Sequence, residues 1–370
     1  MTSIQKFSVF RLALMAMAVS MAFSAGSAAQ TYSNPVLRRD CPDPTILDDR
    51  ERSGYFYLYS TQSQRDGNAI ASRDASADEP EDIISLPIYR SRNLTDWEFV
   101  GDGFAEGRPE WVRNTRIWAP DINYVDGKYM LYYALGAWAQ IFREGSGVAV
   151  SDSPCGPFTD LGEVVSFKST GVTNSIDPAL FIDDDGQKYL FWGSLGPGSG
   201  IWAIKLDPSG LKPADGARKK KLGASNMEGA YVFKRDGWYY LFTSKGTCCN
   251  HEKSTYRLAV ARSRNVFGPY VGPDGKRLTS GGFDNIIMEG NGEFVGTGHC
   301  TQIISDDSGQ QWMAYHSYWE GNGHINRCLC IDRIGWTEDG WPYFPDASGS
   351  PDEAAVANPG VGVPVPVILR

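Results

Sequence analysis

The chain is poor in cysteine and histidine, and it has no hydrophobic run long enough to cross a membrane. Seven cysteines and four histidines among 370 residues are too few for a disulfide scaffold, and no paired cysteine spacing indicates zinc. Positive charge is also scarce, because 35 lysines and arginines stand against 44 acidic residues, for a net charge of -9. That sign disfavours nucleic acid and anionic membrane surfaces as partners. With 42% hydrophobic and 21% charged residues, the chain has the composition of a folded globular protein.

The first 29 residues have the order of a secretory signal peptide. Two basic residues, Lys6 and Arg11, precede an apolar run over 12–23, and small residues follow over 27–29. The apolar run is about half of the roughly 20 residues that a bilayer span needs. We therefore expect cleavage after Ala29, export to the periplasm or the extracellular space, and a single domain over residues 30–370.

A glycine followed by an aromatic, β-prone run occurs five times, beginning at Gly54, Gly127, Gly186, Gly237 and Gly309. Such glycines suit hairpin turns because glycine accepts positive φ without steric cost. A short apolar segment precedes each run, and four of the five runs are followed by a further β-like stretch. Five units of three or four strands, without a long amphipathic helix, predict an all-β fold and specifically a five-bladed β-propeller. A β-sandwich is the alternative all-β arrangement.

Acidic residues and one histidine stand where the innermost strands of such a propeller would begin: Asp43, Asp121, Asp177, Glu228 and His299. Each aspartate alone fits an ordinary turn with proline. In a propeller, however, the starts of the inner strands converge on one mouth of the central channel. Carboxylates gathered around one axis repel one another and lose water, so stability alone gives little reason to gather them.

Two carboxyl groups facing each other, one protonated and one ionised, are the minimal equipment for hydrolysis of a glycosidic bond. Aromatic residues near these segments, including Trp118 and Trp138, fit a role in stacking on sugar rings. A neutral polysaccharide needs no basic groove, which agrees with the acidic net charge.

At this point the chain resembles glycoside hydrolase family 43, and more closely its arabinan-degrading members. The resemblance covers nearly all of residues 30–370, and its motifs are Asp40-Cys41-Pro42-Asp43-Pro44, Trp118-Ala119-Pro120-Asp121, the segment 172–178, Glu228-Gly229, Cys248-Cys249 with Ser254-Thr255-Tyr256, and Gly298-His299. It implies a five-bladed propeller and an inverting mechanism. In that mechanism Asp43 is the general base that activates water, Glu228 is the general acid, and Asp177 raises the pKa of the acid and orients it.

The resemblance also implies residues that bind the substrate. Asn174 and Ser194 align with polar residues that contact the sugar, Trp118 aligns with its stacking platform, and Arg327 aligns with a basic residue near the acid pair. Asp121 and Trp138 complete the predicted substrate-binding set.

His299 resembles the family's channel histidine, which in arabinanases helps to hold a metal, often calcium, through water. A buried, hydrogen-bonded histidine is the alternative interpretation, because calcium prefers oxygen ligands. No organic cofactor is expected.

The leading hypothesis is therefore an exported, monomeric hydrolase of α-1,5-linked L-arabinan. An exo-acting α-L-arabinofuranosidase or β-xylosidase is the alternative within the enzyme class. The Cys-Pro-Asp-Pro opening motif and the long loop over 68–88 leave endo and exo action open. A non-catalytic carbohydrate-binding propeller and a calcium-held scaffold are alternatives from other classes.

Overall fold

The computed structural model describes residues 31–70, 82–109, 111, 116–136, 144–346, 355–356 and 363–368. The chain divides into two units, Met1–Gln30 and Thr31–Arg370. The predicted signal peptide lies outside the described residues, so everything below concerns the second unit.

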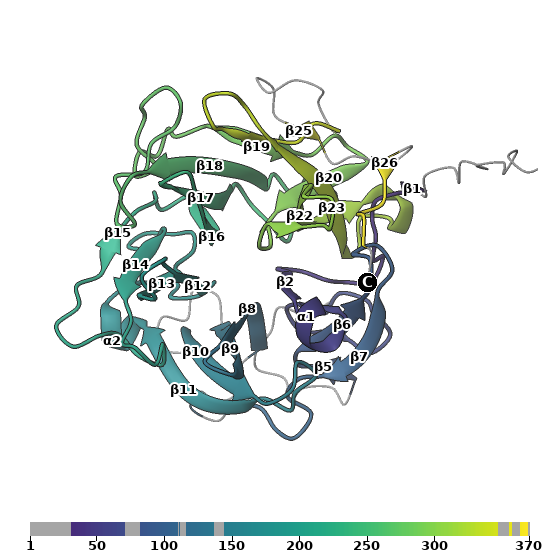
Figure 1. Cartoon of the computed structure of the whole chain (residues 1–370), viewed down its shortest axis with the longest axis horizontal. Coiled ribbons are helices and arrows are strands. Elements are labelled where there is room, and N and C mark those ends of the chain that lie inside the picture. The colour runs from purple at the N-terminus through teal and green to yellow at the C-terminus, as the bar shows by residue number, and fades with distance from the viewer. Residues whose placement is uncertain are drawn as a thin grey trace, which may run out of the picture. The chain divides into compact units, whose positions relative to one another are not determined.

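Five small antiparallel sheets follow one another along this unit (Figure 1). The first contains β2 (Thr45–Asp48), β3 (Phe56–Tyr59), β6 (Pro87–Ser91) and β7 (Glu98–Asp102). The second contains β8 (Arg116–Val125), β9 (Lys128–Gly136), β10 (Gly145–Ser151) and β11 (Thr159–Ser166). The third contains β12 (Ala179–Ile182), β13 (Lys188–Trp192), β14 (Trp202–Lys205) and β15 (Lys220–Lys221).

The fourth sheet contains β16 (Met227–Arg235), β17 (Trp238–Lys245), β18 (Arg257–Ser263), β19 (Ile286–Glu289) and, parallel to β19, β25 (Ala355–Val356). The fifth contains β20 (Phe294–Gly298), β22 (Gln311–Trp319), β23 (Arg327–Trp336) and β24 (Pro342–Tyr343), with β21 (Ile304–Ser305) also paired to β22. Apart from β21 and β25, the strands of each sheet form an antiparallel meander in chain order, as expected for propeller blades.

The remaining elements are short. Strand β1 (Thr31–Tyr32) pairs with β26 (Val363–Pro364), and β4 (Ser63–Gln64) pairs with β5 (Ile83–Ile84). The helices are α1 (Arg50–Ser53), α2 (Phe167–Thr170), η1 (His251–Lys253) and η2 (Glu320–Asn322). Within the described ranges, none of these helices has the length and apolar character needed to span a lipid bilayer.

The hydrophobic cores lie between neighbouring sheets. One core joins Tyr57 of the first sheet to Leu131 of the second, and comparable cores join the second sheet to the third, the third to the fourth and the fourth to the fifth. The last joins Leu58 of the first sheet to Trp312 of the fifth. Because every sheet packs against the next and the fifth packs against the first, the five sheets close into a ring (Figure 1). The predicted five-bladed propeller is confirmed, and the sandwich alternative, which needs only two packed sheets, is wrong.

The five glycine-aromatic runs form the second strands of the five sheets, namely β3, β9, β13, β17 and β22. Between β8 and β9, Asp126 and Gly127 have φ values of 50° and 83°, as a type I′ hairpin turn requires. This turn returns the chain sharply, so the aromatic run lies directly beside the inner strand of its blade.

Candidate active site

A residue with left-handed backbone geometry lies in or beside the inner strand of every blade. The φ values are 51° at Asp43, 38° at Ala119, 56° at Asp177, 61° at Gly229 and 50° at His299. Left-handed geometry at a residue other than glycine costs on the order of 1–3 kcal/mol and is concentrated at functional sites. Its appearance in all five blades places a local bend of the backbone beside each of the predicted site segments.

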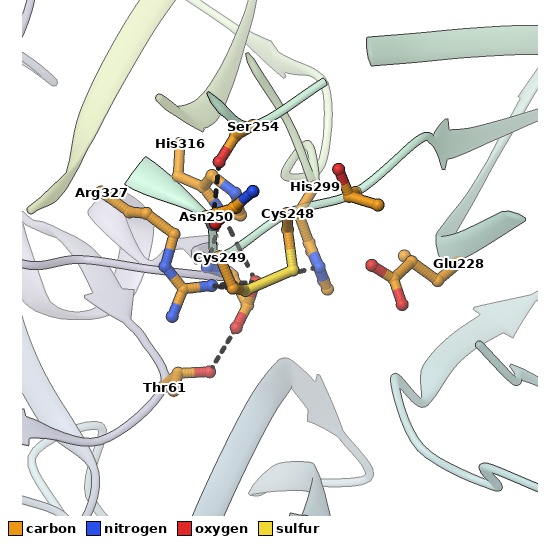
Figure 2. Close-up of a disulfide and its surroundings, with 12 residues drawn as sticks. Thr61, Glu228, Cys248, Cys249, Asn250, Ser254, His299, His316 and Arg327 are labelled. Carbon is orange, nitrogen blue, oxygen red and sulfur yellow. Dashed lines mark hydrogen bonds and ion pairs between the residues drawn. A yellow bond between two sulfur atoms is a disulfide. The ribbon is translucent and has the colours of Figure 1, made fainter. Parts of the chain in front are cut away.

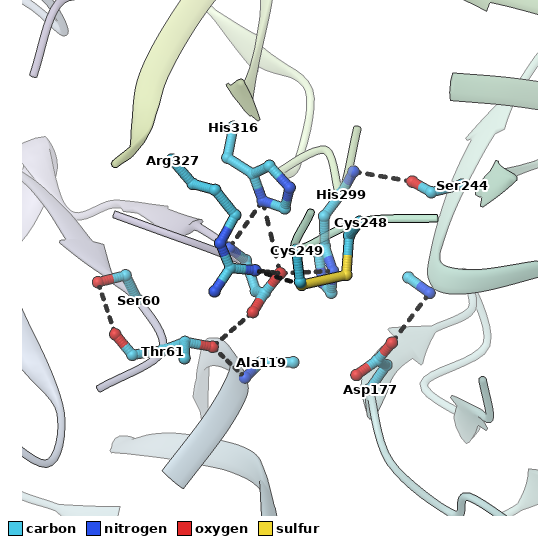
Figure 3. Close-up of polar contacts among 12 residues, drawn as sticks. Ser60, Thr61, Ala119, Asp177, Ser244, Cys248, Cys249, His299, His316 and Arg327 are labelled. Atoms are coloured by element: carbon cyan, nitrogen blue, oxygen red, sulfur yellow. Dashed lines mark hydrogen bonds and ion pairs between the residues drawn. A yellow bond between two sulfur atoms is a disulfide. The ribbon is translucent and has the colours of Figure 1, made fainter. Parts of the chain in front are cut away.

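Asp43 is surrounded by hydrogen-bond donors and positive charge. The hydroxyl of Thr61 donates to Oδ2 at 2.6 Å, while Oδ1 lies 3.2 Å from Nδ1 of His299 and 3.5 Å from Nη1 of Arg327 (Figure 3). Burial alone raises the pKa of Asp43, but Arg327 and His299 outweigh it and hold the pKa well below its usual range. Asp43 is therefore ionised at neutral pH.

The charge of Asp43 acts in turn on His299. Burial disfavours the imidazolium, yet the neighbouring carboxylate of Asp43 raises the pKa of His299 to about 9. The Ser244 hydroxyl accepts a hydrogen bond from the His299 backbone N–H at 2.8 Å and fixes the start of the turn (Figure 3). His299 is thus a cationic partner that stabilises the ionised carboxylate of Asp43.

His316 lies beside Asp43 but does not form an ion pair with it. Its Nδ1 is 3.4 Å from Oδ1 of Asp43, and it also accepts the backbone N–H of Asp43 at 3.0 Å. A ring nitrogen that accepts this hydrogen bond carries no proton, and burial lowers the pKa of His316 well below its usual value. His316 is therefore a neutral acceptor that fixes the backbone carrying Asp43.

Glu228 and Asp177 form a buried acid pair on the other side of the centre. Burial raises the pKa of Glu228, and burial together with the charge of Glu228 raises the pKa of Asp177 to about 8. Oδ2 of Asp177 accepts the backbone N–H of Gly229 at 3.2 Å, which ties it to the residue after Glu228. Because two close carboxylates resist ionising together, the pair retains a proton near neutral pH.

The carboxyl group of Glu228 is oriented by hydroxyl donors. Ser194 donates a short hydrogen bond to Oε2, and Tyr256 adds a second hydrogen bond. In Figure 2, Glu228 extends from the side opposite Thr61 and Arg327, with its carboxyl group directed towards them. The carboxyl group of Glu228, from the pair that retains a proton, is therefore directed towards the side that carries the residues around the ionised Asp43.

Comparison with known proteins identifies the family of this chain. The family described as Glycosyl hydrolases family 43 matches residues 32–342. This chain belongs to glycosyl hydrolase family 43. The predicted family is confirmed, and the protein is a glycosidase.

Relatives of this family 43 glycosidase include both endo- and exo-acting enzymes. It is 30% identical over 339 residues to an extracellular endo-α-(1→5)-L-arabinanase of Bacillus subtilis, covering 89% of this chain and 95% of that one. It is 29% identical over 283 residues to an extracellular exo-α-(1→5)-L-arabinofuranosidase of Cellvibrio japonicus, covering 70% and 79%. The solved structure of an α-L-arabinanase of Cellvibrio cellulosa complexed with arabinohexaose has a TM-score of 0.70 at 26% identity, covering 82% of this chain and 95% of that one.

Trp118 lies flat against the neighbouring strand of its blade. A Cβ atom on Gly136 would stand 1.8 Å from Cε3 of the Trp118 ring, so only glycine permits this approach. The indole remains half-buried and is held by the backbone of β9. A large aromatic ring fixed in this way in a glycosidase suits stacking on a sugar.

Asp121 is hydrogen-bonded to residues of two other blades. It lies two residues beyond the left-handed Ala119, and it accepts hydrogen bonds from Nε2 of Gln302 at 2.8 Å and the backbone N–H of Leu180 at 2.7 Å. Burial raises its pKa to about 7. These contacts connect the second, third and fifth blades, so Asp121 helps to fix the ring. Its predicted contact with substrate stays a prediction.

The other predicted contacts have different placements in this family 43 chain. Arg327 lies beside Asp43, whereas the resemblance implied a place near the acid pair, and the hydroxyl of Ser194 donates to Glu228. The side-chain amide of Asn174 donates to the carbonyl of Leu195 at 2.5 Å, which holds the loop that carries Ser194. Trp138 lies outside the described residues.

The predicted calcium at His299 can be compared with the donors near it. Among the described residues, no three His, Cys, Asp or Glu side chains form a group that could hold a metal. Nδ1 of His299 faces Asp43, and calcium prefers several oxygen ligands. The described side chains do not fit a protein-built calcium cage, so no step below passes through a metal, and a water-held ion stays a prediction.

Sequence reasoning missed several residues of this site. Thr61 and His316 lie in the second strand or just beyond it, where a hydroxyl or a buried histidine resembles ordinary packing. Asp40 accepts the backbone N–H of Arg327 at 3.0 Å, and burial raises its pKa to about 6. Asp40 and Tyr256 were visible only as members of the family motifs.

Proposed function

We propose that this family 43 glycosidase hydrolyses α-1,5-linked L-arabinan with inversion at the anomeric carbon. The observation that carries the proposal is the pairing of an ionised Asp43 with a proton-retaining pair, Glu228 and Asp177, around one channel mouth. The relatives named above are an endo-α-(1→5)-L-arabinanase and an exo-α-(1→5)-L-arabinofuranosidase, which supports the substrate class.

In the proposed reaction Asp43 removes a proton from water. Its carboxylate is ionised and held by Thr61, His299 and Arg327, so it is available as a base at neutral pH. The water attacks the anomeric carbon while Glu228 gives its proton to the leaving oxygen. Inversion needs the two carboxyl groups about 6.5–9.5 Å apart, because the water must fit between base and substrate.

Asp177 is proposed to keep the acid protonated. Its carboxyl group is buried, and repulsion between the two carboxylates opposes loss of the second proton from the pair. Its hydrogen bond from the backbone N–H of Gly229 also fixes the turn that carries Glu228. Asp177 thus acts through the acid.

The remaining predictions complete the proposal. A neutral polysaccharide suits a chain of net charge -9, and Trp118 supplies a fixed aromatic ring for it. The two curated relatives named above are extracellular, which supports the proposed export of this chain after removal of residues 1–29. We propose a monomeric enzyme without an organic cofactor.

Two isosteric substitutions test the catalytic assignment. Asp43→Asn and Glu228→Gln should each lower kcat on debranched arabinan by about 10²–10⁴ or more, because each removes a proton-transfer group. The melting temperature of each variant should stay close to that of the wild type. NMR of the first product formed reports the anomeric configuration, and a retained configuration or near-full activity of either folded variant would contradict the assignment.

Exo-acting cleavage is the second candidate. It is supported by the exo-acting Cellvibrio japonicus relative and by the structure of an exo-1,5-α-L-arabinanase from a bovine ruminal metagenomic library, with a TM-score of 0.68 at 27% identity. Chromatography of early products separates the candidates, because internal cleavage releases mixed oligomers and end-trimming releases one product of uniform length. Xylan assayed alongside distinguishes a β-xylosidase.

A further inference from the structure

Two adjacent cysteines form a disulfide at the catalytic centre. Cys248 and Cys249 are bonded to each other, whereas Cys41, Cys155, Cys300, Cys328 and Cys330 carry free thiols. The disulfide lies on the loop between β17 and β18, and Figures 2 and 3 show it between Arg327 and the side of the centre that carries Glu228 and Asp177. It contributes no proton-transfer group to the reaction proposed above, so it needs another explanation.

The loop that carries this disulfide is closed at its base. The backbone N–H of Thr255 donates to the carbonyl of Thr247 at 3.0 Å, and the backbone N–H of Thr247 donates to the hydroxyl of Thr255 at 3.1 Å. A Cβ atom on Gly246 would stand 2.3 Å from the carbonyl oxygen of Thr255, so the closure requires glycine there. Nδ1 of His251 also lies 2.9 Å from the carbonyl oxygen of His324 in the fifth blade. The disulfide therefore has a defined position.

The sulfur of Cys249 contacts the guanidinium that holds the base. Nη1 of Arg327 lies 3.5 Å from Sγ of Cys249 and 3.5 Å from Oδ1 of Asp43. The same nitrogen thus lies between the disulfide and the catalytic carboxylate. At its other end the loop leads into Tyr256, which is hydrogen-bonded to Glu228. One loop therefore contacts both sides of the reaction centre.

We propose that the Cys248–Cys249 disulfide is a positioning element that holds Arg327 against Asp43. This inference rests on the proposed function, because Arg327 affects the reaction only if Asp43 is the general base. The covalent bond joins the two side chains and leaves them one shared arrangement, so Sγ of Cys249 stays against the guanidinium. Two separate thiols or hydroxyls would each choose among several rotamers, and the guanidinium would lose a fixed neighbour.

Reduction of the wild-type enzyme tests this without a substitution. Dithiothreitol supplies two electrons and two protons, the S–S bond becomes two thiols, and the reagent becomes its cyclic disulfide. Mass spectrometry verifies the gain of two hydrogens. We expect kcat to fall by about 10–100-fold, as misplacement near a reacting group does, with KM changing by less than about threefold. Removing the reductant and reoxidising should restore kcat.

A double-mutant cycle separates positioning from general structure. Cys248→Ser/Cys249→Ser and Arg327→Met should each lower kcat, and their combination should be no worse than Arg327→Met alone, because the disulfide acts through that residue. Cys155→Ser, in a different blade, is the matched control. It should have the kcat of the wild type, and dithiothreitol should lower that kcat by the same factor as in the wild type. Melting temperatures are measured for all variants.

Two results would overturn the proposal. One is a reduced enzyme with unchanged kcat. The other is a combined variant whose fold-loss in kcat equals the product of the losses of the cysteine variant and of Arg327→Met. Reduction of the folded wild type keeps the question answerable even where a variant does not fold. Failure here is distinguishable from failure of the proposed function, because the latter appears as activity retained in Asp43→Asn or Glu228→Gln.

Discussion

Replacing Ser194 with alanine should move the alkaline limb of the pH profile to higher pH. The hydroxyl of Ser194 is fully buried and donates a short hydrogen bond to Oε2 of Glu228. That bond stabilises the carboxylate form and lowers the pKa of Glu228, against the effect of burial, which raises it. Without the hydroxyl, the carboxyl group holds its proton to higher pH.

The size of the shift follows from the burial of both partners. A hydrogen bond to a charged group contributes about 1.5–3 kcal/mol, because water cannot replace a buried donor. That free energy corresponds to a pKa change of about one to two units. The plateau value of kcat should also fall, by about tenfold, since Glu228 loses one of the two hydroxyl donors that orient it.

The assay is the pH dependence of kcat/KM on debranched arabinan, whose alkaline limb reports the acid of the free enzyme. Ser225→Ala is the matched control, because it removes a loop hydrogen bond to Ser199 without touching Glu228. Its limb should coincide with that of the wild type. A limb that stays in place or moves to lower pH in Ser194→Ala would refute the assignment of Glu228 as the general acid.

Three further substitutions test separate parts of the site. Thr61→Val removes a hydrogen-bond donor from the carboxylate of Asp43, which raises the pKa of that group. The acid limb of the pH profile of kcat/KM should therefore move to higher pH by about one unit, and an unchanged limb would contradict the base assignment. Gly136→Ala places a Cβ 1.8 Å from the Trp118 ring, so KM should rise several-fold with altered tryptophan fluorescence, whereas an unchanged KM would argue against a sugar platform. Burial raises the pKa of Asp121 from 3.8 to about 7 in the folded protein, so the free energy of unfolding decreases as the pH rises through that window. The melting temperature should therefore fall less between pH 4 and 8 in Asp121→Asn than in the wild type. An equal fall in both proteins would refute this.

The fold was predictable because its signals are local. A glycine such as Gly127 with φ of 83° and the aromatic strand after it are neighbours in sequence, and the hairpin they form needs no distant contact. Five such hairpins specify five blades, and the family motifs at Asp43, Asp177 and Glu228 then mark the channel. The sequence alone therefore determined the number of blades, the family and the three candidate acids.

The environment of each acid was decided only by tertiary structure. Asp43 is ionised because Arg327 and His299, more than 250 residues away in the chain, come within 3.5 Å of it, and no local pattern encodes that approach. The neutral state of His316 follows likewise from its burial by folding, together with one long-range hydrogen bond from the backbone N–H of Asp43. Protonation depends on burial and on charges brought close by folding, so sequence could name the acids but could not say which one holds the proton.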